Sequence, residues 1–356
     1  MKEQFKLGTK GIGNGYPCLI IAEISCNHLQ NKQMAMDLID AAKEAGADAV
    51  KFQAYTPDTM TLNPEHMQNR EKEHFTIKGS IWEGRTFYDL YQEAYTPWEW
   101  FADLKKKAEQ LDLFFLVTPF DDSSVEFLEK LGVEAYKIAS FEINHIPMIK
   151  KIAKTKKPVI FSTGVAEEKD IKLALDTLNE NGNDQTVILK CTSAYPAPAT
   201  EANLVMIRAM KERFGTLVGL SDHTTSPDIP AYAVALGACI VEKHFTLEKK
   251  GPDAEFSLLP DDFSQMVKNI RACEAALGNI SYELSERANA HRAYVRSIFA
   301  SKNIMSGEPL TRENICVIRP GLGMHPKHYE AIIGKKAARE IKVGEPIVDK
   351  ILETCR

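Results

Sequence analysis

Short apolar runs recur along the first 250 residues of this chain, separated by longer amphipathic stretches. The runs have the length of buried strands, and most of the stretches between them repeat their apolar positions at helical spacing. The eight runs occupy residues 18–24, 49–53, 114–120, 135–140, 158–164, 187–195, 217–222 and 239–245. Eight strand–helix units in succession predict a (β/α)8 barrel, an α/β fold whose active site lies at the carboxyl ends of the strands.

The stretches between the runs predict helices. In residues 31–46, Met34, Leu38 and Ala42 fall on one face, and Gly46 is suited to end the helix. Further helices are expected at residues 97–111, 123–131, 146–154, 167–181, 203–214, 228–237 and 261–277. The gap at residues 54–96 is longer than a connection needs. Its aromatic residues suit either a binding loop over the barrel mouth or a small packed subdomain.

The pattern changes after Gly278. Residues 281–293 are polar and predict a linker between a barrel domain over residues 1–280 and a small β-rich domain over residues 294–356. A weak internal repeat marks the small domain, because IMSGEPL (304–310) is echoed by IKVGEPI (341–347). Each copy predicts a strand, a glycine turn and the start of another strand. A domain of this size suits a docked or oligomerised module.

Charge and cysteine content limit the classes of protein. The 44 basic and 49 acidic residues are well mixed and give a net charge of −5, which argues against a nucleic-acid partner or an anionic membrane surface. The seven cysteines are widely spaced and form no CxxC pair, which favours a reduced cytoplasm over a disulfide framework. We find no apolar stretch near 18 residues and no leader-like segment, and therefore expect no membrane span.

Two histidines end neighbouring strand runs. His223 follows the seventh run and His244 lies in the eighth, so both imidazoles are expected at the same depth in the barrel mouth. A lone histidine is more often structural, but two at matching depth favour a divalent cation. Spacing shows no obvious third ligand; Glu23 and Asp253 are candidates. Positions left open for water and substrate would suit a catalytic ion.

Four lysines lie in or at the ends of apolar runs, where an unpaired cation is costly. Lys190 and Lys243 are expected to be the structural pair. Lys51 and Lys137 would then face the barrel mouth, where a pocket for a phosphate and a carboxylate would also use the hydroxyls of Ser140, Ser193 and Ser221. The predicted ligand is a small, doubly anionic molecule.

Three carboxylates accompany these cations. Glu23 could act as a base or stabilise a cationic intermediate, or it could simply form an ion pair with Lys51. Glu142 and Asp253 lie on flanking loops, where carboxylates are usually only solvated but can bind sugar hydroxyls or amides.

Three functions remain open on these residues. One is a metal-assisted enzyme that forms a carbon–carbon bond on a phosphorylated carboxylate, and the histidine pair favours it. The second is a Schiff-base aldolase that uses Lys137 or Lys190. The third, a carbohydrate-binding protein without catalysis, leaves the clustered lysines, carboxylates and histidines unexplained.

The motifs at the strand ends, in their order and spacing, resemble the nonulosonic (sialic) acid synthases. They are AEISCNH (22–28), VKFQ (50–53), YKIAS (136–140), STG (162–164), CTSAYPAP (191–198), GLSDHT (219–224), EKHFT (242–246) and GPD (251–253). The resemblance covers nearly the whole chain, and residues 297–323 resemble the SAF (antifreeze-like) domain of the same enzymes. It implies a TIM barrel followed by a SAF domain.

The resemblance also implies an activity. The family condenses phosphoenolpyruvate with an amino-sugar aldehyde and releases phosphate by C–O cleavage, which makes it a transferase-type synthase. A divalent metal is implied, with Mn2+ expected first and Mg2+ or Co2+ as alternatives. A domain-swapped homodimer is implied too, in which the SAF domain of one chain covers the barrel mouth of its partner.

Motif matching implies roles for individual residues. His223 and His244 correspond to the metal ligands and belong, with Glu23, to the catalytic set. The phosphoenolpyruvate contacts correspond to Lys51, Lys137, Ser140 and Ser221, with Ser193 beside them. The sugar contacts correspond to Gln53, Glu142, Tyr195 and Asp253, and Arg319 corresponds to the arginine that reaches the substrate of the partner.

The chain departs from the N-acetylneuraminate synthases where Ser193 replaces their asparagine and where SCNHLQ (25–30) replaces a GINHEG-like stretch. Residues 79–100 instead resemble the pseudaminic acid branch of the family, whose sugar is 2,4-diacetamido-2,4,6-trideoxy-altrose. The methyl group and second acetamido group of that sugar imply a more apolar pocket, which we expect the loop around Trp82 to supply. Legionaminic and N-acetylneuraminic acid synthesis are the alternatives.

Overall fold

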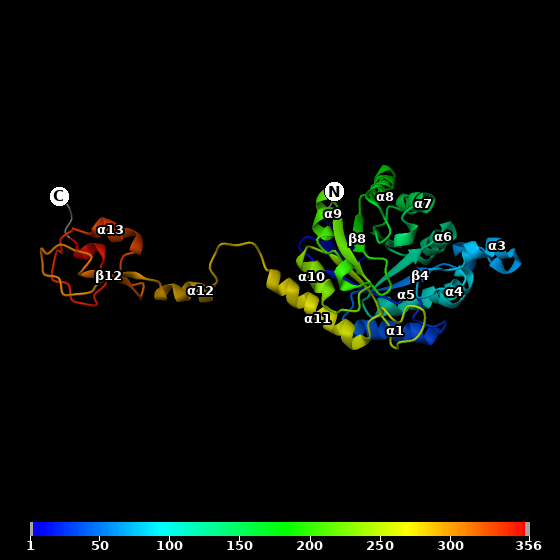
Figure 1. Cartoon of the computed structure of the whole chain (residues 1–356), viewed down its shortest axis with the longest axis horizontal. Coiled ribbons are helices and arrows are strands. Elements are labelled where there is room, and N and C mark those ends of the chain that lie inside the picture. Colours follow the sequence, from blue (N-terminus) through cyan, green and yellow to red (C-terminus); the bar gives the residue numbers. More distant parts are fainter. Residues whose placement is uncertain (1–2, 353–356) are drawn as a thin grey trace. The chain divides into compact units, whose positions relative to one another are not determined.

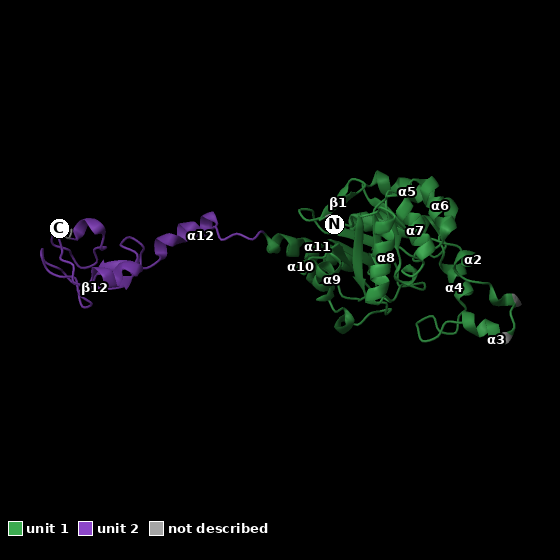
Figure 2. Cartoon of the chain, turned by 90° about the horizontal axis from the view of Figure 1, so that it is seen from above, with its two compact units in different colours: residues 1–278 green, residues 279–356 purple. Residues whose placement is uncertain are grey.

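The structure is a computed structural model that describes residues 3–352. It divides the chain into two compact units, residues 1–278 and residues 279–356 (Figure 2). Cys355 and the predicted end of the small domain at residue 356 lie outside the described residues, and the six cysteines that are described are free.

The first unit contains the predicted (β/α)8 barrel (Figure 1). Eight parallel strands close in the order β10-β3-β4-β5-β6-β7-β8-β9. Their bounds are β3 Leu19–Glu23, β4 Ala49–Ala54, β5 Phe114–Pro119, β6 Tyr136–Ile138, β7 Val159–Ser162, β8 Thr186–Cys191, β9 Leu217–Asp222 and β10 Ile240–His244. Because each strand comes from one of the eight apolar runs, the fold prediction is confirmed.

The helices around the barrel agree with the sequence periodicity to within a few residues. They are α1 Lys32–Glu44, α5 Phe101–Gln110, α6 Asp122–Leu131, α7 Ile146–Lys154, α8 Glu168–Glu180, α9 Met206–Phe214, α10 Ile229–Ala235 and α11 Pro260–Leu277. Local chemistry sets their ends. At α6 the Asp121 side chain accepts hydrogen bonds from the backbone of Ser123 and Ser124, and Gly132 ends the helix at φ +74°.

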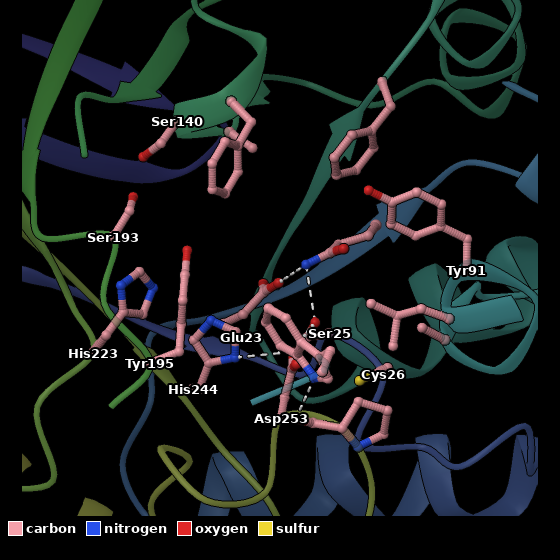
Figure 3. Close-up of a pocket in the computed structure, with 18 of the residues that line it drawn as sticks. Glu23, Ser25, Cys26, Tyr91, Ser140, Ser193, Tyr195, His223, His244 and Asp253 are labelled. Atoms are coloured by element: carbon pink, nitrogen blue, oxygen red, sulfur yellow. Dashed lines mark hydrogen bonds and ion pairs between the residues drawn. The ribbon is translucent and has the colours of Figure 1, made fainter. Parts of the chain in front are cut away.

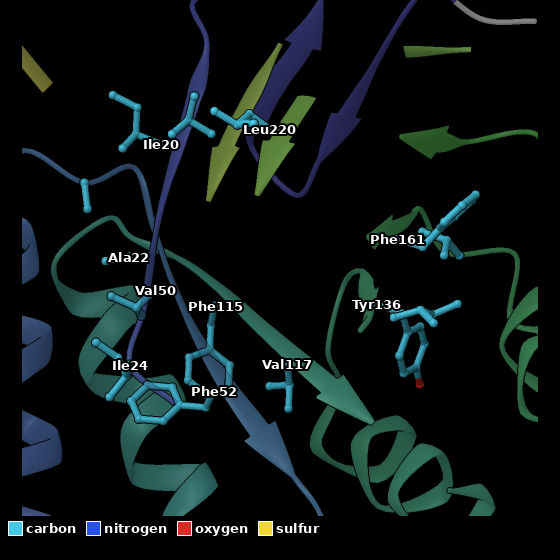
Figure 4. Close-up of a cluster of buried hydrophobic side chains, with 14 of the residues drawn as sticks. Ile20, Ala22, Ile24, Val50, Phe52, Phe115, Val117, Tyr136, Phe161 and Leu220 are labelled. Atoms are coloured by element: carbon cyan, nitrogen blue, oxygen red, sulfur yellow. The ribbon is translucent and has the colours of Figure 1, made fainter. Parts of the chain in front are cut away.

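The strands alternate between two apolar layers. Side chains such as Ile21, Leu116 and Ile160 fill the barrel interior. Their neighbours in sequence, including Ile20 and Val117, pack outward between the barrel and the helices (Figure 4). This alternation fixes which residue at each strand end faces the barrel axis.

A short hairpin, which the sequence analysis did not predict, closes the amino-terminal end of the barrel. Its strands β1 Gln4–Leu7 and β2 Lys10–Gly13 pair antiparallel. Phe5, Leu7 and Ile12 join the apolar cluster that fills the barrel interior. The hairpin therefore closes the amino-terminal end of the barrel interior, and the cavity considered below lies at the carboxyl end.

Residues 54–96 form a packed helical insertion whose side chains reach the barrel mouth. It holds α2 Pro57–Met60, α3 Asn69–Lys72, α4 Phe87–Ala94 and two short 3-10 helices, Pro64–His66 and Glu73–Phe75. The Tyr55 ring makes an edge contact with Tyr91 at 5.6 Å. The two interpretations of this segment therefore combine, since it is both packed and part of the cavity wall.

The second unit is built mostly from turns around a small apolar cluster. It contains β11 Ser297–Ala300, β12 Ile315–Ile318, α12 Glu286–Ala290 and α13 Tyr329–Ile332. The predicted repeat is present, because Ile304 and Ile341 pair antiparallel and the turn glycines Gly307 and Gly344 have φ values of +81° and +82°. The strands predicted beside these turns are single bridges instead.

The segment predicted as a linker is also partly helical. The Ser285 side chain accepts a hydrogen bond from the Ala288 backbone and starts α12 within it, because a serine at this position satisfies a free helix-terminal N–H. Within residues 3–352, we find no helix long and apolar enough to cross a membrane.

Candidate active site

A cavity of about 490 Å³ opens at the carboxyl ends of the barrel strands (Figure 3). The structure brings all of the predicted site residues of the barrel to its wall, namely Glu23, Lys51, Gln53, Lys137, Ser140, Glu142, Ser193, Tyr195, Ser221, His223, His244 and Asp253. Arg319 belongs to the second unit. Lys190 and Lys243, expected to be structural, do not line the cavity; Lys243 instead pairs with Asp222 at 2.5 Å.

Two buried lysines and two buried glutamates form the charged floor of the cavity. Lys51 Nζ lies 2.9 Å from Glu23 Oε2 and 3.6 Å from Glu242 Oε1. Lys137 Nζ lies 3.5 Å from the same Glu242 oxygen and donates to Ser162 Oγ at 2.7 Å. Each cation therefore has a carboxylate neighbour, as a buried charge requires, and the predicted Glu23–Lys51 ion pair is present.

Glu242 is a site residue that the sequence analysis missed. Strand alternation could have found it, because Ile240, Glu242 and His244 face the barrel axis while Val241 packs outward. Ser25, Ser162 and Phe256 also line the cavity without having been predicted.

The two histidines lie side by side, with ring centroids 5.3 Å apart. The Nδ1 atom of His223 hydrogen-bonds to the carbonyl of Thr192 at 2.9 Å, and its Nε2 atom makes no hydrogen bond to the described residues. His244 Nδ1 is buried without a hydrogen-bond partner among the described residues and lies 3.6 Å from Asp253 Oδ2. Burial, with the charges of His223 and Lys51, lowers the pKa of His244 well below its usual value, so its imidazole is neutral.

The neutral form is the one that binds a metal. Against the effect of burial, Cys191 raises the pKa of His223, so that ring would have to lose a proton to bind an ion. Across the part of the chain that the structure describes, however, no three His, Cys, Asp or Glu side chains are grouped to hold an ion. Neither Glu23 nor Asp253 thus completes a ligand set with the histidine pair. Two imidazoles with open positions between them remain compatible with an ion that is bound partly by substrate and water.

Three predicted serine hydroxyls line the same cavity as the lysines. The Gly164 backbone donates to Ser140 Oγ at 3.0 Å, and Ser221 Oγ donates to Glu242 Oε1 at 3.2 Å. Ser193 Oγ is buried without a protein hydrogen-bond partner in residues 3–352. A side chain at position 164 would meet this hydroxyl, because a Cβ there would lie 2.1 Å from it. The glycine therefore keeps a small polar recess open, and the hydroxyls with nearby cations suit an anion.

Polar side chains on the insertion side are linked in a chain of hydrogen bonds. Gln53 Nε2 donates to Glu23 Oε1 at 2.7 Å and to Ser25 Oγ at 3.0 Å. Ser25 Oγ donates to Asp253 Oδ2 at 2.6 Å. Trp82 joins them from the insertion, since its indole donates to the Pro252 carbonyl at 3.1 Å and its ring packs 5.7 Å from Tyr195.

The chain matches the model of the NeuB family over residues 38–282 and that of the SAF domain over residues 295–353. It is 44% identical over 330 residues to the pseudaminic acid synthase of Campylobacter jejuni, which covers 92% of this chain and 94% of the relative. It is 35% identical over 353 residues to the N,N'-diacetyllegionaminic acid synthase of Legionella pneumophila, with 97% and 98% covered. The crystal structure of the N-acetylneuraminic acid synthetase of Leptospira borgpetersenii aligns at 30% identity with a TM-score of 0.71, covering 82% of this chain and 95% of that one.

The barrel, its charged mouth and these matches define the class of protein as an enzyme of the transferase-type synthases. The chain belongs to the NeuB family, whose members include sialic acid-type synthases, and it carries a SAF domain at its carboxyl end.

Proposed function

We propose that this enzyme condenses phosphoenolpyruvate with 2,4-diacetamido-2,4,6-trideoxy-altrose and releases pseudaminic acid and phosphate. The observation that carries the proposal is the pair of buried cations, Lys51 and Lys137, beside serine hydroxyls and a histidine pair in one cavity. The 44% identity to a pseudaminic acid synthase supports the choice of branch. Manno-configured 2,4-diacetamido sugar and N-acetylmannosamine are the alternative substrates within the family.

Phosphoenolpyruvate has two anionic ends that match this floor. Lys137 would hold the phosphate together with Ser140, Ser193 and Ser221, and Lys51 would hold the carboxylate. When the enol carbon attacks the sugar aldehyde, positive charge develops at C2 of phosphoenolpyruvate. Glu23 would stabilise it, because fixed charges in a water-poor site act strongly on developing charge. Water then adds at C2, and phosphate leaves from the resulting tetrahedral carbon.

The histidine pair fits a divalent ion. His223 Nε2 and the neutral ring of His244 would hold Mn2+, or Mg2+ or Co2+ in its place. When bound, the ion would polarise the sugar aldehyde as a Lewis acid. Gln53, Glu142, Tyr195 and Asp253 would bind the sugar beside it.

The SAF domain would complete the site in a domain-swapped homodimer, with Arg319 of one chain reaching the sugar in the barrel of the other. Exposed apolar side chains support a partner for both parts of the chain. Ile280 and Tyr282 are fully exposed in the segment after the barrel, and Phe141 is 61% exposed at the cavity wall.

The test is phosphate release from phosphoenolpyruvate with Mn2+ and each of the three sugars. Preference for the altrose sugar supports the proposal, and preference for another sugar contradicts the branch. A Schiff-base aldolase is the second candidate, because burial lowers the pKa of Lys137, as an imine-forming lysine requires. Borohydride inactivation that depends on substrate would support that candidate, whereas loss of activity with a chelator would oppose it.

A further inference from the structure

The cavity has a second, apolar half on the side opposite the histidines. In the closed order of eight strands, β5 stands four places from β9 and β6 stands four places from β10, and the histidines lie at the ends of β9 and β10. Phe120 follows β5, and Glu142 follows β6. The insertion covers this side, so the apolar half lies between the insertion and these two strand ends.

We name this half the annex and define it by the apolar and aromatic side chains that line it, Tyr55, Ile77, Phe87, Leu90, Tyr91, Ala94 and Phe120. Aromatic contacts fix its shape. Tyr91 stacks on Phe87 at 6.1 Å and meets the edge of Tyr55 at 5.6 Å, and Tyr55 meets Phe120 at 5.1 Å. A rigid apolar recess of this kind suits a small apolar group of a ligand.

Two polar groups at the annex lack partners. The Tyr91 hydroxyl points into the cavity (Figure 3) and makes no hydrogen bond to the described residues. Glu142 Oε2 is buried and likewise has no hydrogen-bond partner within residues 3–352. The two groups are electrostatically coupled, because burial and then the Glu142 charge raise the pKa of Tyr91 to about 12. The buried Glu142 oxygen is unfavourable without a partner, and the Tyr91 hydroxyl is open to the cavity, so a ligand there can satisfy both groups.

A donor and an acceptor beside an apolar recess match a secondary acetamido group. We propose that Tyr91 and Glu142 bind the 4-acetamido group of the sugar and that the annex receives the methyl group of this acetamido group. Tyr91 donates to the amide carbonyl, and the Glu142 carboxylate accepts from the amide N–H. This assignment rests on the proposed function, which places the aldehyde end of the sugar at the histidines and its far end toward the annex.

The subsite would make the enzyme selective for the acylated sugar. A 4-hydroxyl group in place of the amide has no methyl group to fill the annex and no carbonyl oxygen to accept from Tyr91. Sites built to hydrogen-bond a substrate group discriminate strongly against analogues that lack it, since their own buried polar atoms are then left unpaired.

The test compares Tyr91→Phe with Tyr88→Phe on two sugars, the 2,4-diacetamido-trideoxy hexose and the same hexose with a 4-hydroxyl group. Tyr91→Phe removes only the hydroxyl and keeps the ring contacts. Tyr88→Phe is the matched control on the same helix, because the Tyr88 hydroxyl donates to Asp58 at 3.2 Å and its side chain does not line the cavity.

Tyr91→Phe should lower kcat/KM for the diacetamido sugar by about three- to tenfold, mainly through KM, and leave the value for the 4-hydroxyl sugar within about twofold. Tyr88→Phe should change neither value. An equal loss on both sugars, or no loss on either, overturns the subsite while the proposed function stands. No phosphate release by the unaltered enzyme with either sugar overturns the proposed function and the subsite with it.

A second variant tests the recess itself. Ala94 lines the annex from α4, and Ala94→Leu should fill it. The variant should lose the diacetamido sugar and retain the 4-hydroxyl sugar, with folding checked by circular dichroism. Equal retention of both sugars by the folded variant contradicts the placement of the methyl group. If Ala94→Leu does not fold, the proposal is decided by the change that Tyr91→Phe makes in kcat/KM for the diacetamido sugar relative to the 4-hydroxyl sugar.

Discussion

The Glu242 carboxylate lies 3.5 Å from the Lys137 ammonium group at the bottom of the barrel mouth, with both side chains at most 5% exposed. The same oxygen lies 3.6 Å from Lys51. Glu242→Gln should lower the free energy of unfolding by ~3 kcal/mol, because it leaves a buried lysine without its carboxylate neighbour. Chemical denaturation at neutral pH measures this change.

Repeating the denaturation with added phosphate tests whether the two lysines bind an anion. An anion that occupies the same floor should stabilise Glu242→Gln more than the unaltered enzyme, since it supplies the missing negative charge. Glu126→Gln is the control. Glu126 pairs with Lys151 at 2.6 Å on the surface, and its loss should change stability little, because water screens an exposed ion pair. Equal phosphate effects on Glu242→Gln and the unaltered enzyme would show that the two lysines do not bind the anion.

The sequence predicted the barrel and most of its mouth because both follow from local patterns. Glu23 and His244 end apolar runs, and the ends of parallel strands meet at one rim of a barrel. Glu242 was missed because it lies inside its run, where only the two-residue alternation back from His244 distinguishes it from a position that faces the helices.

Other features depend on contacts between distant residues. Trp82 donates to Pro252, 170 positions away, and no pattern around either residue indicates the bond. The hairpin β1–β2 was missed since its four-residue strands are too short to show a period. Its apolar residues pack against the barrel interior, and this contact is not visible in the local sequence.

Loss of one histidine tests the metal assignment. His244→Ala should abolish both phosphate release and Mn2+ binding while the barrel stays folded, because the ring supplies a ligand and lies at the end of β10, outside the apolar clusters of the barrel. Equilibrium dialysis with Mn2+ measures binding independently of turnover, and circular dichroism checks the fold. Full turnover in this variant would contradict the metal site.

Arg319 tests whether the SAF domain acts on the partner's barrel. Arg319→Ala should raise the KM for the sugar far more than the KM for phosphoenolpyruvate. At a sugar concentration too low for Arg319→Ala to turn over appreciably, its co-expression with the inactive Lys137→Ala should then restore roughly a quarter of the activity, because half of the dimers contain one intact site when domains are swapped. No recovery in the purified mixed dimer would place Arg319 in its own barrel or outside the site.

Substitution of Gly164 tests whether the hydroxyls of Ser140 and Ser193 bind the phosphate of phosphoenolpyruvate. The φ of this glycine is not left-handed, so Gly164→Ala places no strain on the backbone, but the new Cβ would lie 2.1 Å from Ser193 Oγ and 3.0 Å from Ser140 Oγ. The serines must move, and KM for phosphoenolpyruvate should rise by about tenfold or more, as expected when hydrogen bonds to a charged group are lost. Steady-state kinetics at saturating sugar measures the change. An unchanged KM would exclude these two hydroxyls as phosphate contacts.

Protonation of Glu142 should make the stability of the enzyme depend on pH. Burial raises the pKa of this carboxyl from 4.5 to about 7, against the opposing effect of Lys137. Between these two values the folded enzyme keeps a proton that the unfolded chain has lost, so its stability falls as pH rises from 4.5 toward 7. Because glutamine does not titrate, Glu142→Gln removes this loss of stability with rising pH. The variant should match the unaltered enzyme below pH 4.5 and become more stable by up to ~3 kcal/mol above pH 7, the value that corresponds to the shift. Denaturation curves at a series of pH values measure the difference, and a constant offset across the range would show that Glu142 keeps an ordinary pKa.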